Sequence, residues 1–447
     1  MIIKNRDALA NTQLKKQVLD IIEAGINQVL PPNIMRSAVK YDAAIRKIMV
    51  GNDVYDITDS RIFVIGGGKA SGLMAKAFED IIGVDNITEG VVNCKGGKQE
   101  TKKIKIIIAG HPIPDKRGVN GVNEMLALKH RYSIGEKDII ICLISGGGSS
   151  LLPYPAETVN LEDKQVITAL LVGSGAEISE INVVRKHLSG IKGGQLGNFF
   201  SPATIISLIL SDVIGNDLSV IASGPTFPDS STFADAWDVL KRYDFINKAP
   251  KSVIEYLARG RRSDEEETPK KLGNCHNYII GDNRLALEAM LNKAIDMGLA
   301  PYIITDRQKG DTGEVARLRA GEVLKKKYGE YNLFIIGGET TVTLPAGAGR
   351  GGRNQHYTAA SLAAMAPYSG RWVVACVSTD GSDFLPDVAG AMVDHDSAGV
   401  ARVNGLDVNS YLERYDSNTL LDRMGNALII TGDTGTNVAD VILYRTV

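Results

Sequence analysis

The sequence is poor in cysteine, and this scarcity argues against several kinds of protein. Its 447 residues include four cysteines, Cys94, Cys142, Cys275 and Cys376, and no two of them form a C-x-x-C pair. No H-E-x-x-H motif or other zinc-ligand spacing occurs, so neither a zinc site nor a disulfide-stapled scaffold is expected. We expect the cysteines to serve as small apolar side chains in a reducing compartment.

Long apolar segments and an excess of charge of one sign are also lacking. No apolar stretch approaches the ~20 residues that a membrane helix needs, and the N-terminal MIIKNRDALANTQLKK lacks the pattern of a signal peptide. The net charge is −2, from 50 basic and 52 acidic residues, which argues against a nucleic acid or an anionic membrane as partner. We expect a cytoplasmic protein that acts on small molecules, as a monomer or a homodimer.

Glycine is the residue in excess, with 47 of 447 positions. This is about a tenth of the chain, against ~7% in typical proteins. Most glycines follow short β-branched apolar runs, and stretches with helical character, such as 11–30 and 283–298, lie between the runs. This alternation predicts a three-layer α/β fold with largely parallel sheets. The predicted strands are residues 62–65, 106–109, 139–144, 204–210, 302–304, 333–336, 372–377 and 428–430.

One segment interrupts this alternation. RRSDEEETPKK, residues 261–271, carries blocks of opposite charge, a proline and almost nothing to bury, which is typical of a linker or a long surface loop. The chain is long enough for more than one domain. We therefore predict two α/β domains, residues 1–262 and 263–447, and the sequence leaves open on which of them the N-terminal helix packs.

Turns rich in glycine follow several of the predicted strands. They are VIGGGKAS (64–71), LISGGGSS (143–150), FIIGGETT (334–341) and VSTDGSD (377–383). Ligands of open α/β sheets bind at the carboxyl ends of the strands, where glycine lets the backbone approach and a helix N-terminus offers free N–H groups. The turns therefore favour a site for an anion with several oxygens. The alternative is that the glycines only let strand and helix pack closely.

These turns do not match the common nucleotide motifs. The glycines at 66, 68 and 72 are one residue too widely spaced for G-x-G-x-x-G, and the strand predicted at 90–95 ends without the acid that would hold a ribose. A Walker A motif requires Ser or Thr where Ala70 follows Lys69. The sequence thus indicates phosphate binding outside the usual NAD and P-loop classes.

Two groups of cations accompany the turns. Lys69 lies within the first turn, and Arg350 and Arg353 lie in the glycine-rich stretch PAGAGRGGRNQHYTAAS, residues 345–361. A lysine can neutralise a phosphate, and an arginine can bind a carboxylate or a phosphate through two parallel hydrogen bonds. The alternative is that these cations are solvated at a helix start and in a surface loop.

Acids and polar residues also follow the predicted strands. A carboxylate there can hold Mg²⁺ or accept a hydroxyl proton, although each one alone could equally be a helix cap or a turn residue. With no covalent nucleophile evident, the residue types favour phosphoryl transfer, which depends on positioning and charge neutralisation. The candidates are Asp212, Asp217, Glu339, Asp380 and Asp383, with His111 as a turn residue or a base and Asn437 as a ligand or a turn former.

At these residues the sequence resembles the type II glycerate kinases, the D-glycerate 2-kinase family whose C-terminal part is called the MOFRL domain. The resemblance covers nearly the whole chain. One departure is Asp433, where the family pattern has proline. The motifs that carry it, in order, are GGGKAS, GHPIPD, LISGGGSSLL, NVVRKHLSGIKGGQL, SDVIGNDLSVIASGPTFPD, GGETTVTL, GRGGRNQH, STDGSDF and TGDTGTNVAD.

The resemblance implies a Rossmann-like first domain, a MOFRL-type second domain and an active site in the cleft between them. It implies ATP and Mg²⁺ as cofactors and the phosphorylation of D-glycerate to 2-phosphoglycerate. The catalytic residues it implies are Lys69, Arg353, Asp212 and Asp380. Substrate binding would add Asn216, Glu339 and Asn437, and Asp212 and Glu339 would hold the metal. The nucleotide phosphates would bind Gly66, Gly67, Gly68, Ser145, Gly146, Gly147, Gly148, Ser149 and Ser150.

Two other functions remain to be weighed against a kinase. The first is an NAD(P)H-dependent reductase of hydroxypyruvate or tartronate semialdehyde, a label that this family has carried, and the broken dinucleotide motif argues against it. The second is a non-enzymatic sensor that closes on a sugar acid. A sensor would not need so many acids beside the glycine-rich turns.

Overall fold

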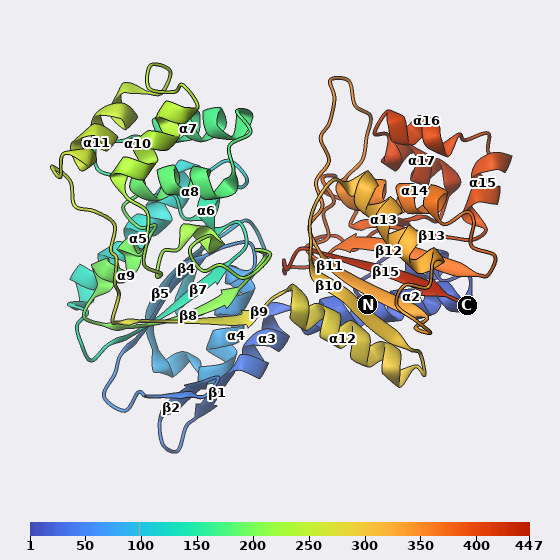
Figure 1. Cartoon of the computed structure of the whole chain (residues 1–447). Coiled ribbons are helices and arrows are strands. Elements are labelled where there is room, and N and C mark those ends of the chain that lie inside the picture. Colours follow the sequence, from blue (N-terminus) through green and yellow to red (C-terminus); the bar gives the residue numbers. More distant parts are fainter. Residues whose placement is uncertain (98) are drawn as a thin grey trace. The chain divides into compact units, whose positions relative to one another are not determined.

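The computed structural model describes residues 1–97 and 99–447, and the chain forms two compact units (Figure 1). We call residues 34–280 the central unit, and residues 1–33 together with 281–447, which include both termini, the terminal unit. In the described part of the chain, no helix is long and apolar enough to cross a membrane. Each unit is built around a six-stranded sheet.

The sheet of the central unit has the strand order of a Rossmann fold. Its first five strands in the list below are parallel. If these five strands are numbered 1 to 5 along the chain, starting at β4, their order across the sheet is 3-2-1-4-5. This is the order of a Rossmann fold, so the predicted Rossmann-like topology is confirmed. The order is β6 (Ile104–Ile108), β5 (Ile87–Cys94), β4 (Ile62–Gly67), β7 (Ile139–Ser145), β8 (Thr204–Leu210) and β9 (Cys275–Gly281).

Burial explains why β4 and β7 have continuous apolar sequences. Every residue of both strands is buried, because helices cover both faces of the sheet. A small antiparallel sheet, β1 (Val39–Asp42), β2 (Lys47–Val50) and β3 (Asp53–Asp56), precedes β4. The helices of this unit are α4 (Ser71–Ile82), α5 (Lys116–Tyr132), α6 (Gly148–Leu151), α7 (Leu161–Gly173), α8 (Ile178–His187), α9 (Gln195–Phe200), α10 (Phe233–Arg242) and α11 (Lys251–Arg261), with short 3₁₀ turns η1 (Val84–Asn86) and η2 (Ile221–Ser223).

The sheet of the terminal unit is mixed, so the prediction of largely parallel strands holds only for the central unit. Its strands run in the order β10 (Pro301–Gln308), β11 (Leu333–Gly338), β15 (Asp440–Thr446), β12 (Trp372–Ser378), β13 (Gly390–Asp394) and β14 (Leu428–Ile429). Only β10 and β11 are parallel. The last strand, β15, inserts between β11 and β12 and is antiparallel to both. Strand order of this kind is not visible in a sequence pattern.

Helices cover both faces of this second sheet, with α13 and α14 on one face and α2 and α12 on the other (Figure 1). Helix α14 is buried along most of its length and packs against β12 and β13. The helices are α1 (Arg6–Leu9), α2 (Gln13–Gln28), α12 (Asn283–Asp296), α13 (Thr312–Leu324), α14 (Arg353–Ala364), α15 (Ser397–Val403), α16 (Val408–Glu413) and α17 (Ser417–Met424).

The two units divide at positions other than the predicted boundary between residues 262 and 263. Strand β9 is hydrogen-bonded to β8, so the segment after the charged loop stays with the central unit up to residue 280. The N-terminal helix α2 packs on α12 and belongs to the terminal unit. The predicted helix 11–30 does end before its prolines, but Pro31 then begins a new helix, α3 (Pro31–Ala38), as proline at a first helical position can.

A buried ion pair fixes α2 to its sheet. Lys15 Nζ lies 2.9 Å from Asp394 Oδ2, and both side chains are less than a tenth exposed. Burial alone would raise the pKa of Asp394, but Lys15 and the Ser397 hydroxyl outweigh it and lower this pKa. Removing one partner of such a pair leaves an uncompensated buried charge.

We expect Lys15→Met to lower the free energy of unfolding by about 3 kcal/mol, since Asp394 then loses its cation. Lys16→Met is the matched control, because Lys16 is an exposed lysine on the same helix and should cost less than about 0.5 kcal/mol. Denaturant unfolding of both variants measures the difference. Equal stabilities of the two variants would contradict a structural role for the ion pair.

Candidate active site

Two glycine-rich loops meet at the carboxyl edge of the central sheet. The backbone N–H of Lys69, after β4, donates to the carbonyl of Gly146, after β7, at 2.8 Å. The N–H of Ala70 donates to Ser145 Oγ at 2.9 Å. A Cβ atom on Gly68 would lie 2.1 Å from the same hydroxyl oxygen. Strand order reverses between β4 and β7, so these loops occupy the point of a Rossmann sheet at which ligands bind.

The second loop packs closely against two of the candidate side chains. Gly147 has a left-handed backbone, with φ of 77°. A Cβ there would lie 2.8 Å from His111 Nε2 and 3.2 Å from Lys69 Cγ. Glycine therefore lets both side chains lie directly against the loop. The structure thus brings Lys69, His111 and the loop of residues 145–150 together.

Further polar residues lie at the same edge. Asp212 and Asn216 follow β8, which is parallel to β7 and next to it, and both are partly buried. Asn216 has a left-handed backbone, with φ of 59°. Asp217 is exposed, and its Oδ1 accepts the N–H of Ser219 at 2.8 Å. The structure thus favours a turn-forming role for Asp217 and leaves Asp212 and Asn216 as candidates.

In the terminal unit, Arg353 is held by two acids. Its Nε and Nη2 donate to the two carboxylate oxygens of Asp440 at 2.5 and 3.0 Å, and Nη1 lies 2.8 Å from Glu339 Oε1. Burial would lower the pKa of Arg353, but the two carboxylates outweigh it and raise this pKa. Three of the five N–H groups of the guanidinium are engaged in this way, which leaves two for a ligand.

Arg353 and Glu339 border a cavity of about 410 Å³ whose lining residues all belong to the terminal unit. Phe384, at its rim, is 80% exposed. His356 stacks on Tyr415 with ring centroids 5.2 Å apart. The cavity thus combines the acid-held guanidinium with aromatic walls. Its lining is Glu339, Thr340, Thr341, Val342, Leu344, Gly351, Gly352, Arg353, His356, Asp383, Phe384, Tyr415 and Ser417.

The two acids of STDGSD have different surroundings. Asp383 is buried and caps α14, since its carboxylate accepts the N–H groups of Asn354 at 3.0 Å and Gln355 at 2.9 Å. Burial raises the pKa of Asp383 to about 6, although these hydrogen bonds oppose the shift. Asp380 accepts the Ser378 hydroxyl and the N–H of Ser382, both at 2.9 Å. Asp383 therefore positions α14, which begins with Arg353.

The last loop supplies Asn437, which is buried, with its Oδ1 accepting the N–H of Ala439 at 3.3 Å. In the same loop Asp433 replaces the proline of the family pattern. Its Oδ1 accepts the N–H of Gly435 at 2.9 Å, a side-chain turn that restrains the backbone as a proline would. Arg350, by contrast, is exposed, and its backbone N–H donates to Asp416 Oδ1 at 2.9 Å.

Sequence reasoning missed Asp440, the main partner of Arg353. Its signal in the sequence is an acid directly before a run of apolar residues, DVILYR, at positions 440–445. An acid buried at the start of a strand requires a cation nearby. No sequence pattern indicates which cation that is.

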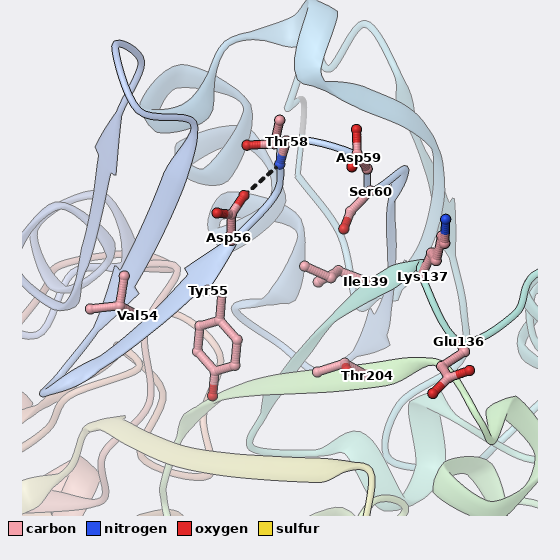
Figure 2. Close-up of a pocket in the computed structure, with 10 residues that line it drawn as sticks. All are labelled: Val54, Tyr55, Asp56, Thr58, Asp59, Ser60, Glu136, Lys137, Ile139 and Thr204. Carbon is pink, nitrogen blue, oxygen red and sulfur yellow. Dashed lines mark hydrogen bonds between the residues drawn. The ribbon is translucent and has the colours of Figure 1, made fainter.

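A second cavity, of about 640 Å³, lies at the opposite edge of the central sheet (Figure 2). It includes Ile139 and Thr204, the first residues of β7 and β8. Its charged side chains, among them Asp56, Asp59 and Lys137, are exposed. None of the predicted site residues lines this cavity, so the described structure does not connect it to the glycine-rich loops.

Comparison with known proteins places these features in a family. Residues 17–258 match the family model described as a domain of unknown function, DUF4147, and residues 332–440 match the MOFRL family. The glycerate 2-kinase of Pyrococcus horikoshii is 37% identical, over 95% of this chain and 97% of that protein. The D-glycerate 2-kinase of Thermotoga maritima is also 37% identical, over 96% and 98%. This chain belongs to the MOFRL-type glycerate kinase family.

The fold of the family is known from crystal structures. A glycerate kinase from Thermotoga maritima superposes with a TM-score of 0.84 at 35% identity, over 97% of this chain and 99% of that one. Some relatives carry another name. A protein of Agrobacterium vitis called a putative hydroxypyruvate reductase is 38% identical, over 90% of this chain and 92% of its own length.

The close approach of the two glycine-rich loops can be tested by adding a methyl group. We expect Gly68→Ala to destabilise the protein and to lower its activity at least tenfold, because the Cβ would overlap Ser145 Oγ at 2.1 Å and its carbonyl oxygen at 2.5 Å. Gly72→Ala, in the following helix, is the control, since its Cβ would meet only side-chain atoms, the nearest at 3.1 Å. Thermal unfolding and turnover of both variants are the measurements. A Gly68→Ala variant that behaves like Gly72→Ala would show that the loops do not need this contact.

Proposed function

We propose that this chain is an ATP- and Mg²⁺-dependent kinase that phosphorylates D-glycerate to 2-phosphoglycerate. The observation that carries the proposal is the close packing of Lys69 and His111 against Gly147, at the ligand-binding edge of a Rossmann sheet. The glycerate kinase names of its relatives support the substrate class. The free cysteines of the described chain agree with a cytoplasmic enzyme.

In the central unit, the N–H groups of the loop after β7 and the Lys69 side chain would neutralise the nucleotide phosphates. Gly147 fits this role, because a side chain there would push Lys69 away from the loop. Mg²⁺, when bound, neutralises charge on the phosphates. Asp212 has the hard oxygen ligands that Mg²⁺ prefers. Glu339 is less suited to hold the metal, since its carboxylate is already paired with Arg353.

In the terminal unit, Arg353 would bind the carboxylate of glycerate through its two remaining N–H groups. Asp440 and Glu339 hold the guanidinium in place for this contact. Asn216 and Asn437 would contact the substrate hydroxyls.

In the reaction, the bond between the terminal phosphorus and ADP breaks and a new one forms to the 2-oxygen of glycerate. The proton of that hydroxyl passes to a carboxylate, either Asp212 or Asp380.

A reductase is the second candidate, because relatives carry that name. The structure argues against it at the second strand of the Rossmann sheet. Strand β5 ends at Cys94 and Lys95 follows, so no acid is present where a dinucleotide-binding sheet holds the ribose. Incubation with NADH or NADPH and hydroxypyruvate should therefore produce no decrease in absorbance at 340 nm. Steady oxidation of either cofactor would favour the reductase.

The kinase reaction is tested directly by its product. The enzyme is incubated with ATP, Mg²⁺ and D-glycerate, and the phosphoglycerate is identified by phosphorus NMR. We expect 2-phosphoglycerate together with an equal amount of ADP. Formation of 3-phosphoglycerate would contradict the proposed position of attack, and release of ADP without a phosphoglycerate would contradict the acceptor.

Substitution of the two proposed cations tests their roles separately. Lys69→Met should lower kcat by about a hundredfold or more, because a phosphate then lacks its counter-charge. Arg353→Lys should raise KM for glycerate and lower kcat/KM by roughly a hundredfold, since lysine cannot contact Asp440 and a carboxylate through a planar fork. We choose lysine here because alanine would leave the buried Asp440 unpaired.

Lys76→Met provides the control for Lys69→Met. Lys76 lies on α4, and its exposed side chain pairs with Asp80 on the same helix. Its loss should change kcat less than twofold, which circular dichroism and turnover can verify. Near-normal rates in both Lys69→Met and Arg353→Lys would refute the proposed assignments.

A further inference from the structure

Two cations of the central unit, Arg185 and Lys192, form no ion pair with any residue that the structure describes. Lys192 is 2% exposed, and its Nζ donates to the carbonyl of Ala222 at 3.2 Å. Arg185, on α8, is partly buried. Among residues 1–97 and 99–447, neither side chain forms an ion pair. The segment that contains them, NVVRKHLSGIKGGQL, has no role in the function proposed above.

A short chain of contacts connects these cations to the loop. Ser149 Oγ, in the loop, lies 2.9 Å from Ser223 Oγ, which lies 3.3 Å from Asn182 Oδ1 on α8. Asn182 and Arg185 are three residues apart on this helix, so they share one face. Lys192 contacts Ala222, the neighbour of Ser223. Lys192 therefore contacts the segment on which Ser149 rests, and Arg185 lies on the helix that contacts the same segment through Asn182.

The backbone of that segment is itself unusual. Ala222 and Ser223 both have left-handed backbones, with φ of 51° and 62°. Such conformations are costly for residues other than glycine and persist where the surrounding structure enforces them. A Cβ on Gly148 would lie 2.7 Å from the Cβ of Ala222, so the segment is pressed against the loop. The packing that enforces this backbone also fixes the positions of the Ala222 carbonyl and the Ser223 hydroxyl.

Buried charges without partners are unfavourable in a resting protein. Burial and the nearby Arg185 lower the pKa of Lys192 to about 7. The next residue along α8 shows the usual solution, since Lys186 pairs with the buried Asp229 at 3.2 Å. An anion that enters beside Arg185 would compensate its charge and that of Lys192. Unpaired cations at this place thus indicate a ligand with negative charge.

We propose that Arg185 binds the phosphoryl group that the enzyme transfers, with Lys192 as a positioning residue behind it. Arginine suits this task, because its planar fork can contact two phosphate oxygens. Lys192 holds the Ala222 carbonyl by a hydrogen bond and adds a positive charge behind the arginine. The inference deepens the proposed function and rests on it for the identity of the phosphate donor. The same chemistry would suit the carboxylate of glycerate, so the test must separate the two.

The test measures thermal stability of the full-length protein without ligand and with ATP·Mg²⁺, AMP, inorganic phosphate or D-glycerate, each added alone. For Arg185→Met we expect unchanged or higher stability without ligand, because an uncompensated cation is removed. Its affinity for ATP should fall at least about thirtyfold, and stabilisation by inorganic phosphate should disappear. Binding of AMP and D-glycerate should remain. Lys192→Met should weaken ATP binding in the same way, but less.

Lys186→Met is the matched control. It should lower stability without ligand, because Asp229 loses its cation, and it should leave the affinity for ATP unchanged. A merely structural role of Arg185 would give the same pattern as this control and would overturn the inference. Selective loss of D-glycerate binding in Arg185→Met would also overturn it, in favour of a carboxylate site.

Failure of this inference and failure of the proposed function give different results. If the unmodified protein forms no phosphoglycerate but binds ATP or phosphate in a manner that requires Arg185, the proposed kinase reaction is wrong and the anion site stands. If it forms 2-phosphoglycerate while Arg185→Met binds ATP and phosphate normally, only the present inference is wrong. Absence of any ATP or phosphate binding by the unmodified protein would overturn the anion site.

Discussion

The contact between the loops after β4 and β7 is the constraint on which the central unit depends. Ser145 Oγ accepts the N–H of Ala70 and occupies the space beside Gly68, where no side chain could fit. This contact aligns two glycine-rich turns at the reversal point of a parallel sheet. Each loop alone would be a flexible turn. Held together, they form a fixed edge of the sheet, and a fixed polar site binds an anion without the cost of ordering the site first.

The buried cations of this protein differ in whether an acid lies next to them. Arg353 is engaged by Asp440 and Glu339, so its guanidinium has a fixed orientation and still has donors to offer. Lys15 and Lys186 are fully paired with buried acids and hold helices in place. Arg185 and Lys192 differ, since neither forms an ion pair in the described chain, and Lys192 donates to the Ala222 carbonyl. Burial without a counter-charge is tolerated where a ligand supplies that charge, which is why such residues gather at binding sites.

Much of the fold and part of the site could be predicted because they depend on local patterns. Continuous apolar runs predicted β4 and β7 correctly, since strands covered on both faces need apolar side chains throughout. The glycine-rich loops were recognised because glycine is the residue that allows two backbone segments to approach this closely. The position of β15 and the unit boundary at residue 280 were missed, because both depend on strand pairing between distant segments. Asp440 was missed for the same reason.

The sequence by itself determined the class of fold, the family and the candidate anion-binding loops, since each depends on residue types at fixed spacing. Tertiary structure alone decided which charges are compensated. It brought Asp440 to Arg353 across 87 positions of the chain, and within the described residues it left Arg185 and Lys192 without an ion pair. The physical reason is that an electrostatic interaction depends on distance and burial in space, and separation along the chain carries no information on either.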